Sequence, residues 1–383
     1  DSLFGRYTFD DAKVGNPNTT ETFSNPSLSR NQYFTFEETH VFTPTWLNVF
    51  RLGVNRSRGQ SECERLVDFP ATLDLIPGRP FGYSGGMTLS AGVAGLPGLL
   101  NCRTAPHSNW YNLYEASNDM TFIRSAHSLK AGMIVKNIRA NKQSDNSLTG
   151  TYEFATLANF LAGRPLLFES ETLSVDSFRS WRQTLYGFYL QDEWKARPKL
   201  TLNLGLRYEF VTAPIEANGK AAMLLDILDK DTTVFGKKPF LPNVSKKNFS
   251  PRIGFAYDVF GNGHTAVRGG FGLYYDQILP VVYSQPAIRN RPFFSRVLID
   301  NPPYPNAAAL LPSATPSLVG ANNIMVTDNP YLMQYNFSIQ QQFAGTWVVN
   351  VGYIGSRGVH LTSVRDGNSA FPDILPDGRK FFP

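Results

Sequence analysis

The sequence predicts an all-β fold in the form of an antiparallel transmembrane β-barrel, and three observations lead to it. Apolar and polar residues alternate in about eleven segments. Each segment is roughly ten residues long, which is the length that a tilted strand needs to cross a bilayer. The segments come in pairs joined by short turns, and long connections join the pairs. Short periplasmic turns and long external loops are typical of outer-membrane barrels.

The pair at 185–211 shows the pattern most clearly. In its second half the even positions from 200 to 210 are apolar, and the odd positions are Thr, Asn, Gly, Arg and Glu. Side chains of a strand point alternately to its two faces, so this segment has one apolar and one polar face. Lys195, Arg197 and Pro198 suit a short solvated turn between the two halves.

One single strand and four further hairpins repeat this pattern. The strand is expected at 1–9 and the hairpins at 31–57, 120–139, 249–276 and 331–358. The five turns are expected at Pro44, His127, Pro198, Asn262 and Gly345. Two short helices are expected within the connections, one at 157–165, where Gly and Pro end the segment, and one at 223–229.

A soluble β-sandwich would explain one isolated hairpin equally well. A sandwich does not sort its short and long connections to opposite ends, so the repetition along the chain favours the membrane barrel. Unpaired edge groups are not tolerated in hydrocarbon, and bacterial single-chain barrels have even strand numbers. We therefore expect about eleven strands of a larger, 22-stranded barrel, which is the size class of plugged transporters.

Composition agrees with a membrane location and excludes other functions. Charged residues make up 17% of the 383 residues, below the roughly 25% of soluble domains. No run of about 18 apolar residues could form a transmembrane helix. The net charge of +5 comes from scattered basic residues, which argues against a nucleic-acid partner. The N-terminus shows no signal segment, so we expect a fragment or a processed chain.

No catalytic or metal-binding pattern is found. None of the five histidines has a partner at metal-ligand spacing, and G-x-S-x-G is absent. The neighbours Asp192 and Glu193 point to opposite faces of a strand and cannot act as an acid–base pair. We therefore predict no enzymatic activity and no cofactor. Cys63 and Cys102 could form a disulfide or remain two free thiols, and the sequence leaves both open.

Three sets of residues are expected to matter for function. The outward apolar belt should include Leu200, Leu202, Leu204, Leu206, Phe271, Leu273, Val349 and Val351. The candidate luminal residues are Arg207, Glu209, Arg252, Asp258 and Arg268. The long connections 58–117 and 277–329 should lie together at one rim and supply a recognition surface. The candidate binding residues there are Trp110, Tyr111, Tyr114 and Tyr304.

Each of the last two sets has an alternative role. The luminal charges suit a network that contacts a plug better than they suit direct ligand binding. The aromatic residues among Gly and Pro would also suit connections that only pack on one another.

Several stretches from about residue 118 onward carry a family resemblance. They are LYGFYLQDEWKARPKLTLNLGLRYEF, SPRIGFAYDVFGNGHTAVRGGFGLYYD, NPYLMQYNFSIQQQF with VVNVGYIGSRGVHL, HSLKAGM and LANFLAGRP. Together they resemble the TonB-dependent receptors of the Oar-like kind, whereas the first third of the chain matches only in style. The resemblance implies a barrel in the cell outer membrane that takes up a bulky external ligand, and it leaves open the siderophore, oligosaccharide and peptide classes.

The resemblance also implies partners. These are outer-membrane lipid and an inner-membrane energy-coupling protein that reaches N-terminal parts of the receptor. The chain shows no plug domain, no N-terminal coupling segment and no terminal strand ending in an aromatic residue. Residues 1–383 are therefore expected to be part of one barrel domain, and uptake is expected of the parent protein. The alternative function is a cell-surface β-rich adhesion or binding protein without transport activity.

Overall fold

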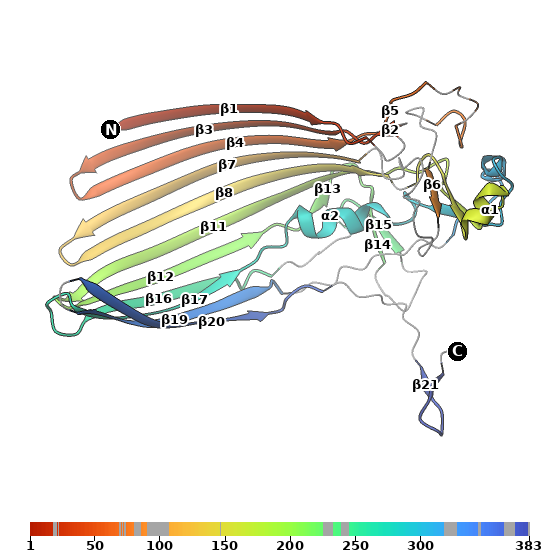
Figure 1. Ribbon diagram of the computed structural model, residues 1–383. Coiled ribbons are helices and arrows are strands. Elements are labelled where there is room, and N and C mark those ends of the chain that lie inside the picture. Colours follow the sequence, from red (N-terminus) through yellow and green to blue (C-terminus); the bar gives the residue numbers. More distant parts are fainter. Residues whose placement is uncertain are drawn as a thin grey trace.

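One antiparallel sheet dominates the protein (Figure 1). The computed structural model describes residues 1–17, 21, 23–68, 70, 72, 74–79, 86–89, 107–145, 147–224, 233–238, 245–317, 328–343, 346–363 and 372–381. Within these ranges eleven long strands pair in the order of the chain. They are β1 (Ser2–Val14), β3 (Ser27–Thr43), β4 (Trp46–Ser61), β7 (His107–Arg124), β8 (His127–Ser144), β11 (Phe178–Arg197), β12 (Leu200–Val211), β16 (Phe249–Asp258), β17 (Thr265–Tyr275), β19 (Tyr331–Phe343) and β20 (Trp347–Val359). The sheet is open, because β1 and β20 are its two edges.

The predicted topology of short turns and long connections is confirmed. The hairpin turns lie at one end of the sheet, and the long connections emerge at the other end (Figure 1). The turn expected at His127 is misplaced, because Ser125 and Ala126 form it and Ser125 takes the left-handed conformation with φ of 53°. The turn at 344–345 lies outside the described residues.

Several strands are longer than predicted. The strands β3, β4, β7, β8 and β11 contain 16 to 20 residues, whereas β12, β16, β17, β19 and β20 contain 10 to 13. The connection expected at 58–117 is therefore wrong at both ends, since β4 continues to Ser61 and β7 begins at His107. In the outer parts of these strands the alternation seen nearer the turns does not continue, because the face that is apolar near the turns becomes polar there.

The register gives the sheet one apolar and one polar face. Leu190 of β11 lies opposite Leu206 of β12 and Ala131 of β8, whereas Tyr189 lies opposite Arg207 on the other face. None of the eight predicted belt residues is buried. Leu204, Leu206, Phe271, Val349 and Val351 are exposed, and the other three are half-exposed. The apolar side chains are thus not packed against a second sheet, as a soluble sandwich would require.

Part of the connections folds back onto the polar face. The helix α2 (Pro280–Ile288) packs on β8 and β11. Trp181 of β11 and Tyr283 of α2 are buried in this contact, and their ring centroids lie 5.1 Å apart. In the same apolar cluster is β14 (Ala221–Leu224), which pairs with β15 (Thr233–Gly236). The helix expected at 223–229 is wrong for Met223 and Leu224, which belong to β14, and 225–229 lies outside the described residues.

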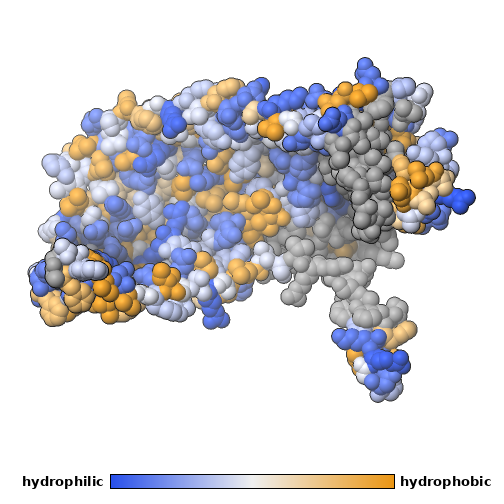
Figure 2. Space-filling model, viewed as in Figure 1, coloured by the Kyte–Doolittle hydropathy of each residue, from blue (hydrophilic) through white to orange (hydrophobic). Residues whose placement is uncertain are grey.

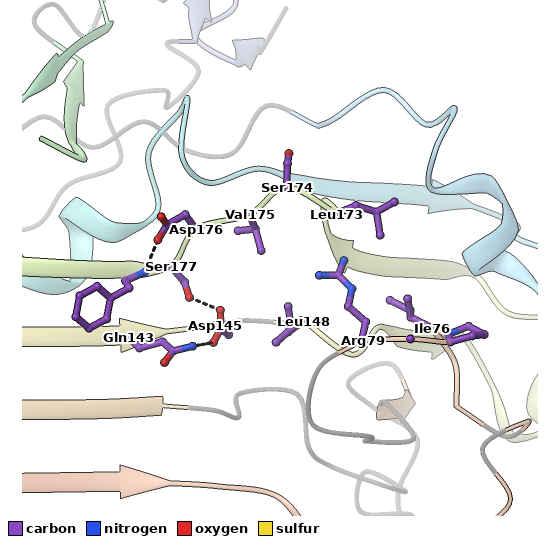
Figure 3. A pocket seen from close by; sticks show the side chains of 13 residues that line it. Ile76, Arg79, Gln143, Asp145, Leu148, Leu173, Ser174, Val175, Asp176 and Ser177 are labelled. Atoms are coloured by element: carbon purple, nitrogen blue, oxygen red, sulfur yellow. Dashed lines mark hydrogen bonds between the residues drawn. The ribbon is translucent and has the colours of Figure 1, made fainter. Parts of the chain in front are cut away.

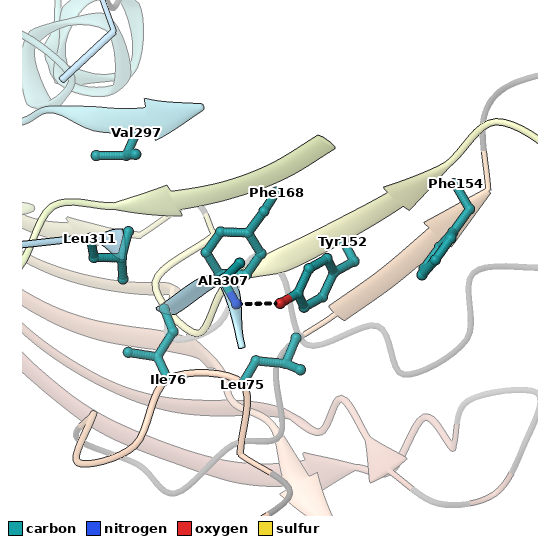
Figure 4. Packing of buried hydrophobic residues seen from close by; sticks show 8 residues of the cluster. All are labelled: Leu75, Ile76, Tyr152, Phe154, Phe168, Val297, Ala307 and Leu311. Carbon is teal, nitrogen blue, oxygen red and sulfur yellow. Dashed lines mark hydrogen bonds between the residues drawn. The ribbon is translucent and has the colours of Figure 1, made fainter. Parts of the chain in front are cut away.

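A second apolar cluster supports a small sheet beyond the long strands (Figure 4). The sheet has the order β18 (Arg296–Asp300), β10 (Leu167–Glu171), β9 (Thr151–Phe154) and β6 (Gly86–Leu89). Tyr152, Phe154 and Phe168 are fully buried, and the Tyr152 hydroxyl accepts a hydrogen bond from the Ala307 N–H at 2.9 Å. The 3-10 helix η2 (Ala307–Leu310) is thereby held against the sheet.

Short elements complete the connections. The predicted helix at 157–165 is confirmed as α1 (Leu157–Leu161), which Thr156 caps at its N-terminus and after which Gly163 has φ of 63°. The remaining strands are β13 (Ile215–Glu216), which pairs with β11, and the pairs β2 (Phe23–Ser24) with β5 (Glu64–Arg65) and β21 (Asp373–Ile374) with β22 (Lys380–Phe381). No helix among the described residues is long and apolar enough to span a membrane.

Replacing Trp181 by alanine should detach α2 from the sheet. Truncating a fully buried aromatic side chain costs about 3–5 kcal/mol. We expect faster protease cleavage within Pro280–Ile288 of the detergent-solubilised, folded W181A protein. Phe188→Ala is the control, because Phe188 lies on the apolar face of the same strand and is 42% exposed. Equal cleavage of both variants would contradict this packing.

Candidate functional site

The five candidate luminal residues share the polar face of the sheet. Arg207 and Glu209 lie opposite Tyr189 and Gly187 of β11. Gly205 of β12 lies opposite Arg252 of β16, and the face continues onto β17, where Arg268 lies opposite Ala256. The same face carries α2, and Figure 2 shows it as the hollowed side of the sheet, with many hydrophilic residues between the two edges. Their roles toward a plug or a ligand stay predictions.

These residues have different partners. Arg207 forms an ion pair with Glu209, and the Arg252 guanidinium lies over the Tyr274 ring, 4.5 Å from its centroid. Arg268 donates to Gln340 Oε1 at 2.6 Å. The Asp258 carboxylate accepts hydrogen bonds from the N–H groups of Gly261 and Gly263, at 2.8 and 2.9 Å. Asp258 therefore stabilises the β16–β17 turn, and none of the other four candidate luminal residues forms a hydrogen bond or an ion pair with Asp258.

A charge network on the polar face was not predicted from the sequence. Arg51 donates through Nε to Glu37 and through Nη1 to Asp119, both at 2.6 Å, and the Tyr189 hydroxyl donates to Asp119 at 2.7 Å. This network links β3, β4, β7 and β11. A Cβ at Gly132 would clash with both Asp119 and Tyr189, so the glycine of β8 leaves the space in which they meet. Arg51 and Tyr189 occupy positions that strand alternation assigns to the polar face, but register alone brings the four residues together.

The candidate binding residues of the external connections do not gather at one place. The assignment of Trp110, Tyr111 and Tyr114 to a loop is wrong, because all three lie in β7. Trp110 and Tyr114 are on the apolar face, whereas Tyr111 packs on the cluster that contains Trp181. Tyr304 does lie in a long connection, where its ring packs at 5.1 Å from the ring of Tyr152. Their role in ligand binding stays a prediction.

A cleft of about 820 Å³ lies among the connections (Figure 3). Arg79 projects into it and donates to the Glu171 and Thr172 carbonyls at 2.7 and 3.2 Å. Asp145 accepts hydrogen bonds from Ser177 and Gln143 on the opposite wall. The cleft thus offers one cation and carboxylates to a polar ligand.

The two carboxylates of the cleft differ in their pKa. Burial raises the pKa of Asp145 above its ordinary value, against its hydrogen bonds from Ser177 and Gln143. Burial also raises the pKa of Asp176, but hydrogen bonds from Lys220 and from the Phe178 N–H outweigh it and leave that pKa below its ordinary value. Asp145 is therefore the carboxyl of this cleft that is more easily protonated.

Neither the cysteines nor a group of metal-binding side chains contributes to the site among the described residues. Cys63 is disulfide-bonded, and Cys102, the other cysteine of the chain, lies outside the described residues. Among the described residues no group of three or more His, Cys, Asp or Glu side chains could hold a metal ion.

An antiparallel sheet with an outward apolar face, a charged opposite face and sorted connections defines an outer-membrane β-barrel protein. The chain belongs to the family described as outer membrane beta barrel domain, whose model matches residues 1–380. The protein is therefore located in the cell outer membrane.

One curated relative and two solved structures are similar to the chain. The chain is 35% identical over 95 residues to the TonB-dependent transporter Oar of Myxococcus xanthus, which covers 25% of this chain and 7% of that protein. The outer membrane transporter YddB from Escherichia coli has a similar fold, with a TM-score of 0.50, 12% identity, and coverage of 92% of this chain and 37% of that structure. A ferric-catecholate import receptor, Fiu from E. coli K12, matches with a TM-score of 0.39 and 10% identity over 99% of this chain and 50% of that structure.

Replacing Arg51 by glutamine should weaken the sheet by breaking its charge network. Glu37 and Asp119 would lose their cation, and because Arg51 is 41% exposed we expect a loss of only about 1 kcal/mol in the free energy of unfolding. Chemical unfolding in lipid vesicles would measure it. Arg6→Gln is the control, since among the described residues the Arg6 side chain bonds only Thr8, on the same face. A double-mutant cycle with Glu37→Gln that gives no coupling would disprove the network.

Replacing Asp145 by asparagine should flatten the pH dependence of stability. A carboxyl whose pKa is higher in the folded than in the unfolded protein favours folding most below its unfolded value of 3.8. That contribution is lost as pH rises through the folded pKa. We therefore expect D145N to gain thermal stability relative to the wild type between pH 4 and 7, with Asp300→Asn as the exposed control. A difference that does not change with pH would refute the assignment.

Proposed function

We propose that the full-length protein is a TonB-dependent transporter that takes up a bulky ligand across the outer membrane. The observation that carries the proposal is the division of the sheet into an outward apolar face and a charged, hollowed face with connections at one end only. The similarity to the transporter Oar supports transport. No feature of the described residues favours the alternative, adhesion without transport.

We further propose that residues 1–383 form part of one barrel domain. The open edges β1 and β20 have unpaired backbone groups that hydrocarbon does not tolerate, so further strands would have to close the sheet. A plug domain within that barrel would contact the polar face, where Arg51 and its partners form a hydrogen-bonded charged group. An N-terminal segment of the full-length protein would bind the inner-membrane energy-coupling protein.

Ligand capture is proposed for the cleft among the connections. Its walls come from three segments of the chain, namely 76–79, the stretch with Gln143, Asp145 and Leu148, and 173–178. Ile76 belongs to the second apolar cluster, and Ser177 donates to Asp145 across two of these segments, so contacts within the chain join parts of the walls. Arg79 and Asp145 make a polar, charged ligand the expected cargo.

Filling the cleft should reduce uptake by cells that carry the full-length protein. The proposed test offers such cells a mixture of siderophores, oligosaccharides and peptides and measures depletion by mass spectrometry, with and without a protonophore. We expect wild-type cells to deplete at least one compound only when energised, and Ser174→Trp, which blocks the cleft, to reduce this by roughly tenfold.

Ser313→Trp is the matched control, because Ser313 is exposed outside the cleft. Depletion that the protonophore does not change would contradict energised transport. Normal depletion by the Ser174→Trp variant at normal surface display would remove the cleft from the capture site and leave the transport proposal standing.

A further inference from the structure

The apolar face does not run the full length of the long strands. Toward the connections this face becomes polar on β4, β8 and β11. On β4 the apolar Val54 is followed on the same face by Arg56. On β8 Val135 is followed by Asn137 and Arg139, and on β11 Tyr186 is followed toward the connections by Thr184 and Arg182. The register aligns three arginines in one row across four strands. Arg56 lies opposite Asn112, Asn112 opposite Arg139, and Arg139 opposite Arg182. We call Arg56, Arg139 and Arg182 the arginine row.

The arginine row points away from the hollowed side of the sheet. The neighbours of its members in sequence, Ile138, Ala140, Trp181 and Gln183, are buried, and Tyr283 of α2 donates to Gln183. Because side chains alternate along a strand, Arg139 and Arg182 project from the face opposite to these buried neighbours. Nearer the turns, the same face of the same strands is the apolar, lipid-facing one. Arg56 and Arg139 are exposed, and Arg182 is half-exposed.

None of the three arginines forms an ion pair with a carboxylate among the described residues, and the only carboxylate whose charge acts on Arg182 from farther away is that of Glu216. Arg139 donates to Asn137 Oδ1 at 3.1 Å, and its guanidinium lies 5.0 Å from the centroid of the Tyr114 ring. Arg182 donates to Asn141 Oδ1 at 2.9 Å and to the Trp181 carbonyl at 2.8 Å. Two like charges directly opposite each other destabilise a sheet, so Arg139 and Arg182 call for an anion from outside the chain.

The height of the row indicates where this anion comes from. Tyr114 and Tyr186 stand at the boundary of the apolar face, and aromatic residues of membrane barrels mark the level of the lipid headgroups. Guanidinium groups bind phosphate through two parallel hydrogen bonds. We propose that the arginine row binds the phosphate groups of an anionic lipid in the outer leaflet. Lipid binding at this place requires neither ligand capture nor transport.

The test uses the purified full-length protein in phosphatidylcholine nanodiscs, with and without lipid A as the bisphosphorylated probe. Native mass spectrometry measures how many lipid A molecules the protein retains after exchange into detergent. Removing all three charges with Arg56→Gln, Arg139→Gln and Arg182→Gln should weaken retention roughly a hundredfold, since each basic residue near an anionic surface contributes about fivefold. The three corresponding Arg→Lys changes should keep most of it.

Arg268→Gln is the matched control, because it removes an arginine from the other face of the sheet and should leave retention unchanged. Heat-modifiable migration on a gel confirms that each variant is folded. Equal retention by wild type and the triple glutamine variant would overturn the proposal. Displacement of lipid A by millimolar inorganic phosphate would also overturn it, since the site would then bind the free anion.

Discussion

The structure depends on the need to pair every backbone N–H and C=O group that enters hydrocarbon. In a bilayer no water replaces a missing partner, so the chain must form an uninterrupted ladder of antiparallel strands. Eleven strands in the described ranges meet this condition along their shared edges. Once the ladder is fixed, the alternation of side chains decides which face each residue occupies. One face must suit lipid, and the other can carry charge.

Charge on the hollowed face is arranged through register rather than through sequence neighbours. Arg51 reaches Glu37 across one strand boundary and Asp119 across the other, and Tyr189 reaches Asp119 from a third strand across β8. Such a contact across an intervening strand requires that strand to carry no side chain there, and Gly132 supplies the space. A glycine in the middle of a strand thus has a positive use here, although it weakens isolated strands.

The sequence was sufficient to predict the barrel class, the number of long strands and the end at which the connections lie. Hairpins such as 185–211 alternate strictly, because lipid and water impose opposite demands on the two faces. The extent of β7 was missed, since His107 to Ala116 has polar residues on both faces and no alternation. The charge network and the cleft were also missed, because they join residues whose contact depends on strand register or on the folding of the connections.

The unequal lengths of the strands explain why the extent of β7 was not predicted. A strand of about ten residues already crosses the bilayer, so β7, β8 and β11 with 18 to 20 residues must extend beyond it. Beyond the bilayer the inner face supports α2 and β14, and it becomes apolar at Ile138, Ala140 and Trp181. The outer face there meets headgroups and water instead of lipid tails, and it becomes polar. The face that is apolar near the turns is therefore polar near the connections, and the opposite face changes the other way. A strand prediction that assumes one constant alternation ends where the faces change.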